Sequence, residues 1–139
     1  NLNNRDFSGM DLSGVDFSNA NLTKASLQNA FFKWATMRLA TLDGVNATGG
    51  HFRLANIALG SAINTNFRNS NFTDADLDSI TATGSDFTDA TLEETHFKKA
   101  SITSTDFTRA NLREANLGGA NFSESIFVDC QMRKADLDK

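Results

Sequence analysis

The sequence predicts an all-β protein, a right-handed quadrilateral parallel β-helix with about seven coils of 20 residues. Three observations predict this fold. A large apolar residue recurs at every fifth position, a small residue stands two places before it, and Asp or Asn often stands directly before it. The frame runs without insertion or deletion through all 139 residues, so we expect a single domain over residues 1–139.

The large apolar residues occupy the positions whose numbers end in 2 or 7, which we call core positions. Leu or Phe fills 21 of these 28 positions, and 11 of the 12 Phe residues of the chain stand among them. Met or Ile fills four more, and Ala fills the last three. So regular a column indicates a short structural repeat.

A period of five excludes the two common secondary structures. In an α-helix, which advances about 100° per residue, successive core positions would step by about 140° and scatter around the axis. In a plain strand, an odd period would place them on opposite faces. The pattern fits a chain that turns by about a right angle every five residues, so that four sides close one coil. The next coil then stacks at about 4.8 Å, the usual spacing between strands.

The positions whose numbers end in 0 or 5, which we call small positions, also face inward. Ala fills 13 of these 27 positions, and Gly, Ser, Thr or Cys fills nine. Since four large side chains already fill the centre of each coil, their inward neighbours must be small. Ile80 is a bulky exception, and the next core position holds Ala82. We expect these two sizes to be exchanged within one side at constant volume.

The repeat thus reads small, Asp or Asn, Leu or Phe, and two variable residues. Residues 20–24 (ANLTK), 75–79 (ADLDS) and 110–114 (ANLRE) resemble the A(D/N)LXX unit of pentapeptide repeat proteins. The resemblance covers the whole chain and implies the β-helical fold of that family. It implies less about function, because members of the family differ widely. Some are dimeric DNA mimics that bind topoisomerase and protect it from quinolones or toxins.

Composition narrows the classes of partner. The 17 acidic and 13 basic residues give a net charge of −4, which disfavours nucleic acid as a partner. No stretch is long and apolar enough to span a membrane, so we expect no membrane insertion. Cys130 is the only cysteine, which excludes an internal disulfide; we expect it to be a buried filler. The chain begins with Asn1 and not with Met, which we interpret as a processed product or an excised domain.

The sequence predicts no enzyme, no cofactor and no metal site. His51 and His96 fall on different sides and coils, so they cannot share a metal or relay a proton. Asp74, Glu94 and Glu114 stack in one column, but basic residues lie among them, which favours a solvated ladder. No Ser or Thr can be singled out as a nucleophile beside a base.

The outside of the coil holds a small group of misplaced apolar residues. Residues 20 apart should stack vertically, as Trp34 does with Leu54 and Leu39 with Leu59. A contiguous exposed apolar surface usually marks a binding site. We therefore predict a non-catalytic interaction or scaffold module that binds a protein partner, or another part of the parent chain. The predicted binding residues are Trp34, Leu39, Leu54 and Leu59, with Ala58 between them and Phe31 on the flanking side.

Two other functions remain as alternatives. A DNA mimic of the topoisomerase-binding type needs a long acidic stripe and a C-terminal dimerisation segment, whereas this chain mixes acids with bases and keeps its repeat up to Leu137. An ice-binding array could use residues 81–83 (TAT) and 101–103 (SIT), which stack on one side. Asp43 and Asn121 interrupt that array, and Thr is in any case favoured in strands.

The ends of the coil and one internal segment also depart from the pattern. Arg5, Met10 and Val15 occupy small positions, which predicts a wide, irregular first coil. A solenoid generally requires caps, so either the caps lie in flanking sequence or two chains form an end-to-end homodimer. Residues 45–51 combine Ala47 with two Gly residues; we interpret them as a local packing defect, with a hinge or ligand contact as the alternative.

Overall fold

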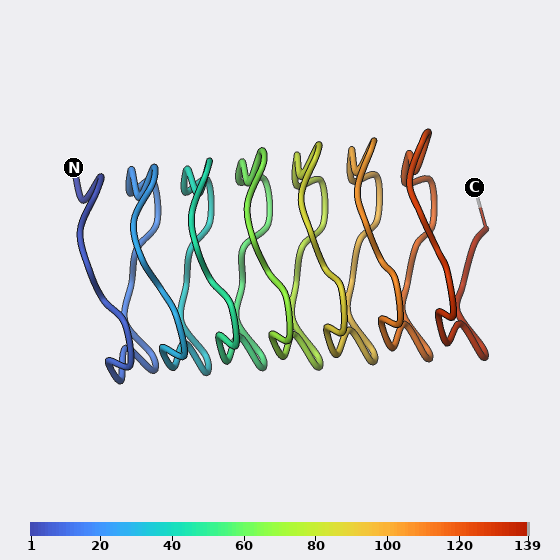
Figure 1. The fold of residues 1–139 in the computed structure, drawn as a ribbon, viewed down its shortest axis with the longest axis horizontal. Helices are drawn as coiled ribbons and strands as arrows, with labels where there is room; N and C mark the ends of the chain where they lie inside the picture. Colours follow the sequence, from blue (N-terminus) through green and yellow to red (C-terminus); the bar gives the residue numbers. More distant parts are fainter. Residues whose placement is uncertain (139) are drawn as a thin grey trace.

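The computed structural model describes residues 1–138, which form a single stack of coils with the two termini at opposite ends (Figure 1). No residue in this range is helical, and each strand is a single bridging residue. Parallel bridges join residues 20 apart, at every fifth position, in an unbroken series from Asp6↔Ser26 to Asn116↔Asp136. The fold is therefore a four-sided parallel β-solenoid. The bridging residues, whose numbers end in 1 or 6, are called ladder positions below.

Each side of the coil ends in a tight turn. The carbonyl of a core residue accepts the backbone N–H three positions later, as Phe72 O does from Ala75 N at 2.9 Å. The second of the two turn residues has φ between +53° and +70° at all 27 positions from residue 4 to residue 134, which is typical of a type II turn. Only six of these positions hold Gly. The other 21 hold a side chain in the left-handed region, which costs an ordinary residue about 1–2 kcal/mol.

The backbone N–H groups of one repeat explain the preference for Asp and Asn. In residues 70–74, Ser70 N–H closes a turn, Asn71 N–H bonds to the coil before, and Phe72 and Asp74 N–H bond to the coil after. Only Thr73 N–H, at the first turn position, lacks a backbone acceptor; it donates to Asn71 Oδ1 at 2.9 Å. Because unpaired backbone donors are costly, a carboxylate or amide at the ladder position stabilises the turn.

This side-chain cap forms wherever the sequence allows it. All 16 Asp and Asn residues at ladder positions accept the N–H two positions later. Two further turns are capped from the previous coil: Asp43 Oδ1 accepts Ile63 N at 2.9 Å, and Asp78 Oδ1 accepts Lys98 N at 2.7 Å. Ten of the 28 first turn positions in the described chain thus remain uncapped.

The core consists of stacked side chains that repeat with the coil. Phe rings on successive coils lie face to face, with centroids 4.9 Å apart for Phe32–Phe52 and 4.7 Å for Phe52–Phe72. Polar small residues satisfy their hydroxyls inside the wall, as Thr95 Oγ1 does by donating to Phe72 O at 2.8 Å. In residues 1–138 no buried side-chain nitrogen or oxygen lacks a hydrogen-bond partner. The inward placement of the core and small positions is therefore confirmed from Leu22 to Leu117, where every one of them is buried.

Three segments depart from the repeat in sequence: residues 80–82, residues 45–51 and the first coil. Ile80 and Ala82 are both fully buried, as the exchange of sizes requires. The ladder runs unbroken through residues 45–51, and a Cβ on Gly50 would lie 2.5 Å from the Phe52 ring. Gly50 thus makes room for that ring, and the coil shows no break there. Met10 and Val15 are exposed in the first coil.

Cys130 differs from the prediction of a buried filler. It is only partly buried, because no coil of the described chain packs on its far side. Its Sγ lies 3.4 Å from Ala110 O, and partial burial raises the pKa of the thiol.

Candidate functional site

The candidate site is a group of exposed apolar side chains on the adjacent coils of residues 21–40 and 41–60. We call Phe31, Trp34, Leu39, Leu54 and Leu59 the apolar patch. Their exposed fractions are 44%, 59%, 51%, 37% and 43%. Backbone hydrogen bonds hold the two coils together here, with Trp34 N donating to Arg53 O and Leu39 N to Ala58 O. The structure therefore places the predicted residues on neighbouring coils, at successive corners.

Four of these residues occupy an unusual position. Trp34, Leu39, Leu54 and Leu59 all lie at second turn positions with φ near +60°. Among the 27 described positions of this kind, they are the only apolar residues; the others are Gly or polar. The left-handed backbone conformation is unfavourable for a bulky apolar residue, and at this position its side chain is also exposed to water. The cluster is thus a departure from the repeat on two coils only.

Ala58 is not exposed as the residues of the apolar patch are. Its exposed fraction is 3%, and its N–H donates to Asn56 Oδ1 at 3.1 Å. Ala58 was predicted to lie between these residues on the binding surface, and in the free chain its side chain is buried. Ala58 forms part of the wall beneath the patch.

Two contacts order the aromatic side chains of the apolar patch. Phe31 stacks on His51 with centroids 4.6 Å apart and an interplanar angle of 7°. Lys33 Nζ lies 3.9 Å from the centroid of the Trp34 ring, a cation–π contact. Both contacts reduce the freedom of exposed rings, which lowers the entropy cost of binding.

The charge around the apolar patch is opposite to that of the rest of the chain. Residues 21–60 carry Lys24, Lys33, Arg38 and Arg53 against Asp43, a net charge of +3. Because the whole chain has −4, the remaining residues carry −7. Arg53 is shared with the next coil through an ion pair to Asp74 at 3.3 Å. Lys33, Arg38 and Arg53 directly precede Trp34, Leu39 and Leu54 in the chain, and we call these three cations the basic margin of the patch.

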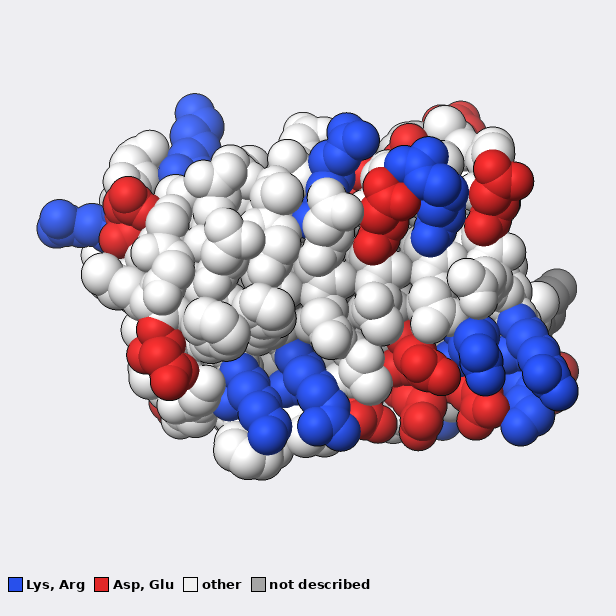
Figure 2. Space-filling model, turned by 60° about the horizontal axis from the view of Figure 1, so that its bottom comes forward, with Lys and Arg blue, Asp and Glu red and all other residues white. Residues whose placement is uncertain are grey.

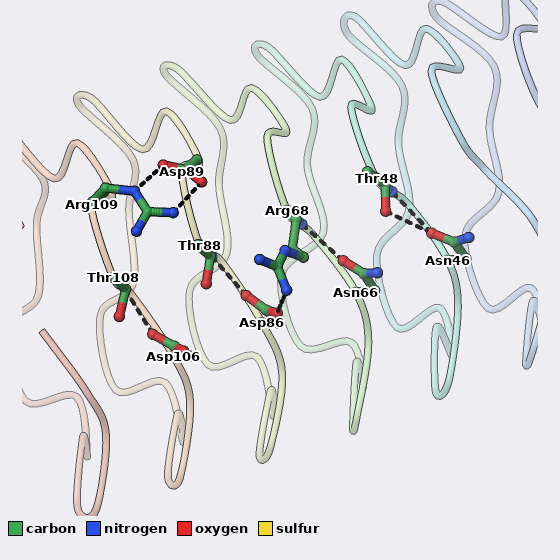
Figure 3. A network of polar contacts seen from close by, with 10 residues as sticks. All are labelled: Asn46, Thr48, Asn66, Arg68, Asp86, Thr88, Asp89, Asp106, Thr108 and Arg109. Atoms are coloured by element: carbon green, nitrogen blue, oxygen red, sulfur yellow. Dashed lines mark hydrogen bonds and ion pairs between the residues drawn. The ribbon is translucent and has the colours of Figure 1, made fainter. Parts of the chain in front are cut away.

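Beyond the patch, acids and bases pair between coils. Arg68 contacts Asp86 at 3.2 Å, and Arg109 holds Asp89 by two bonds (Figure 3). The Arg109 guanidinium lowers the pKa of the Asp89 carboxyl. On the side of the rod drawn in Figure 2, both red and blue side chains cover the C-terminal half; they alternate in the upper row, and a red group lies beside a blue group in the lower row. A continuous acidic stripe is not present on that side.

The predicted acidic column belongs to this pattern. Asp74 pairs with Arg53, and Glu114 pairs with Lys134 at 3.0 Å, which lowers the pKa of Glu114. His51 stacks on Phe31, whereas His96 lies on another side, bridged to Asp76 and Asn116. Within residues 1–138 no group of three or more His, Cys, Asp or Glu side chains could hold a metal ion, and no pocket is present. The described chain also has no helix long and apolar enough to cross a membrane.

On the side proposed as an ice-binding array, some hydroxyl groups form hydrogen bonds with one another. Thr83 Oγ1 and Thr103 Oγ1 lie 3.1 Å apart and form a hydrogen bond. One coil earlier, Asp43 Oδ1 accepts Ser61 Oγ at 2.6 Å. Charged and amide groups thus continue the column on this side.

Comparisons with known proteins agree with this architecture. Eight copies of the family described as "Pentapeptide repeats" match residues 1–38, 60–89, 75–113 and 105–139. The matches leave out residues 39–59, which contain Leu39, Leu54 and Leu59, although the ladder continues through that segment. The comparison with curated proteins found no match.

The solved structures that resemble this chain are pentapeptide repeat proteins. One is a trypsin-treated variant of QnrB1, a plasmid-mediated fluoroquinolone resistance protein, with a TM-score of 0.62 and 22% identity over 98% of this chain and 79% of that chain. Full-length QnrB1 has a TM-score of 0.51 and 13% identity over 96% and 84%. HetL, involved in heterocyst differentiation regulation in the cyanobacterium Nostoc sp. strain PCC 7120, has a TM-score of 0.40 and 21% identity over 94% and 75%. At these identities the likeness concerns the fold alone.

Proposed function

Because the chain belongs to the pentapeptide repeat family, we propose that it is a non-catalytic interaction module that binds a protein partner through the apolar patch. One observation carries this proposal. The only apolar residues among 27 second turn positions are Trp34, Leu39, Leu54 and Leu59, and all four lie on two adjacent coils.

The energetics of the turn support a functional reason for these residues. Elsewhere the same position holds Gly, Asn or other polar and charged residues, which either fit the left-handed backbone or face water without cost. Large apolar residues are unfavourable in both respects. A protein partner that covers them recovers the free energy of apolar burial, about 25 cal/mol per Å². Trp34 belongs to a residue type that is enriched at the centre of such interfaces.

The rod that presents the patch is, in this proposal, right-handed with about seven coils. Crossovers between parallel strands are right-handed in nearly all proteins, and a spacing of about 4.8 Å between coils gives a rod about 33 Å long. Such a rod holds the patch rigidly, since each coil is bonded to the next on every side. A crystal structure would establish both properties.

Replacing Trp34 and Leu54 with Glu tests the function. Glu already occupies equivalent positions at residues 94, 114 and 124 with φ between +57° and +63°, so the double variant should keep the fold. We expect the immobilised variant to lose capture of the partner from an extract of the source cells, and to bind the purified partner at least about tenfold more weakly by calorimetry.

Val128→Glu is the control, because Val128 is 54% exposed and lies more than three 20-residue coils along the chain from Leu54. Its capture should equal that of the wild type. Circular dichroism would verify that both variants are folded. Capture that survives in the Trp34/Leu54 variant would refute the proposal.

The likeness to QnrB1 favours one alternative, a topoisomerase-binding DNA mimic. It rests on a shared fold, whereas the paired charges described above offer no acidic stripe on the side shown in Figure 2. A gyrase supercoiling assay with a quinolone distinguishes the two functions. The interaction module proposed here gives no protection of the enzyme.

A further inference from the structure

We propose that the apolar patch recognises an acidic segment of its partner, a short stretch in which apolar side chains alternate with Asp or Glu. The apolar side chains would cover the patch, and the carboxylates would bind its basic margin. This inference rests on the proposed function and specifies the chemistry of the partner.

The first argument is a recurring pair of residues. At three of the four corners of the patch, a basic residue directly precedes the apolar one: Lys33–Trp34, Arg38–Leu39 and Arg53–Leu54. The basic residue lies at the first turn position and the apolar residue at the second. Each of these three corners therefore offers an apolar contact and a cation side by side.

The second argument is that the same basic residues carry uncapped backbone N–H groups. Their ladder positions hold Phe31, Thr36 and His51 in place of Asp or Asn, and within residues 1–138 no acceptor binds the N–H of Lys33, Arg38 or Arg53. A carboxylate that approaches such a corner can accept from both the N–H and the cation, a strong charge-assisted arrangement.

Basic residues at first turn positions elsewhere are mostly capped. The N–H groups of Arg68 and Arg113 donate to Asn66 and Asn111, and that of Lys98 donates to Asp78. The side chains of Arg68 and Arg113 also contact acids of this chain. At the patch, by contrast, no ion pair within the described chain involves Lys33 or Arg38. These corners are available to a partner's carboxylates.

The distribution of charge favours a short peptide segment over a larger anionic surface. The basic margin spans residues 21–60 only, while residues 1–20 and 61–80 each carry a net charge of −2. A membrane or a nucleic acid would extend over these acidic coils and be repelled. A peptide segment that lies across two coils, about 10 Å by the usual strand spacing, meets the basic margin without them.

A peptide-display selection against the immobilised protein tests the inference. Enriched peptides are synthesised and titrated by the fluorescence of Trp34, which is the only Trp in the chain and lies within the patch. We expect enrichment of peptides with two or more Asp or Glu next to Leu, Ile or Phe. A peptide of the same apolar residues with Lys in place of the acids should bind roughly tenfold more weakly, as expected for a reversed charge at an interface.

The charge-reversed variant Lys33→Glu/Arg38→Glu is the decisive comparison. Acidic residues already occupy first turn positions in the same columns, Glu93 for residue 33 and Asp78 for residue 38, so the fold should tolerate the change. We expect this variant to prefer the Lys-containing peptide. An unchanged preference for the acidic peptide would overturn the inference.

The variant Leu39→Glu/Leu54→Glu separates this inference from the proposed function. If it loses all peptide binding while the charge-reversed variant behaves as the wild type, the patch binds its partner but not through carboxylates. Selection of no peptide that depends on Leu39 and Leu54 would overturn both. A change in Trp34 fluorescence with phosphatidylserine vesicles or duplex DNA equal to that with the acidic peptide would overturn the choice of partner.

Discussion

At the scale of the residue, the ladder position decides how well each turn is stabilised. All 16 Asp and Asn residues there cap a turn, and the ten uncapped turns are not spread evenly. Four of them lie on four successive sides within residues 26–45, after Ser26, Phe31, Thr36 and Thr41. This range includes Trp34 and Leu39. The turns next to the apolar patch therefore lack stabilising side-chain caps, and such departures from the stable pattern are common at functional sites.

Thr36→Asn should stabilise the protein and weaken its binding. In the same column, Asn56 and Asn116 accept the N–H two positions later, so the introduced amide would cap the free Arg38 N–H. A new hydrogen bond of this kind is worth about 1 kcal/mol, which urea unfolding would measure. We expect weaker binding of the acidic peptide, because its carboxylate loses one donor.

Thr36→Val, which offers no acceptor, is the control and should leave both quantities close to the wild type. A Thr36→Asn variant that binds the acidic peptide more tightly than the wild type would contradict the role assigned to the Arg38 N–H.

At the scale of the five-residue side, volume is shared between the two inward residues. In the side of residues 100–104, Ala100 precedes Ile102, which is the common order; in the side of residues 80–84, Ile80 precedes Ala82. All four side chains are at most 1% exposed. The wall therefore accepts either order, provided that the sum of the two volumes is kept.

A double-mutant cycle tests this exchange. Ile80→Ala alone should leave a cavity and cost about 2–5 kcal/mol, and Ala82→Ile alone should overpack the coil at a cost of about 1–3 kcal/mol. The double variant restores the order seen at Ala100 and Ile102, so it should cost less than either single change. Urea unfolding of the four proteins gives the coupling; additive costs would show that the two positions do not share volume.

The positions of the residues in the coil could be predicted from the sequence, but several contacts and burials on the surface could not. The core positions and the stacking of residues 20 apart follow from the period alone, and so do the exposed positions of Trp34 and Leu39. The burial of Ala58 was missed, because most first turn positions face solvent and the period does not single this one out. The caps were detectable in principle, since Asp or Asn two positions before a turn N–H is a known local motif. The stack of Phe31 on His51 depends on ring orientation, which no column reveals.

At the scale of the whole molecule, the rod is one-dimensional. Every bridge joins residues 20 apart, so each coil bonds only to the coils before and after it. Stability in such a solenoid is approximately a sum over coils and their interfaces. The apolar patch is therefore local, and coils that do not carry it act as support. The end-to-end homodimer stays a prediction, with Met10 and Leu137 exposed at the two ends.

Deleting a whole coil separates support from function. Removing residues 81–100 joins Ile80 to Ser101, and removing residues 41–60 joins Ala40 to Ser61; both junctions keep the frame and the columns. Both shortened rods should fold and lose similar stability, since each loses one coil and one interface.

Only the second deletion removes Leu54 and Leu59 from the patch. We expect the rod without residues 81–100 to bind the partner within about threefold of the wild type, and the rod without residues 41–60 to bind at least about tenfold more weakly, because half of the apolar contact and Arg53 are gone. Circular dichroism and calorimetry check the fold and the binding. Loss of binding in the rod without residues 81–100 would mean that the partner contacts a surface beyond the apolar patch, since that deletion leaves every residue of the patch and of its basic margin in place.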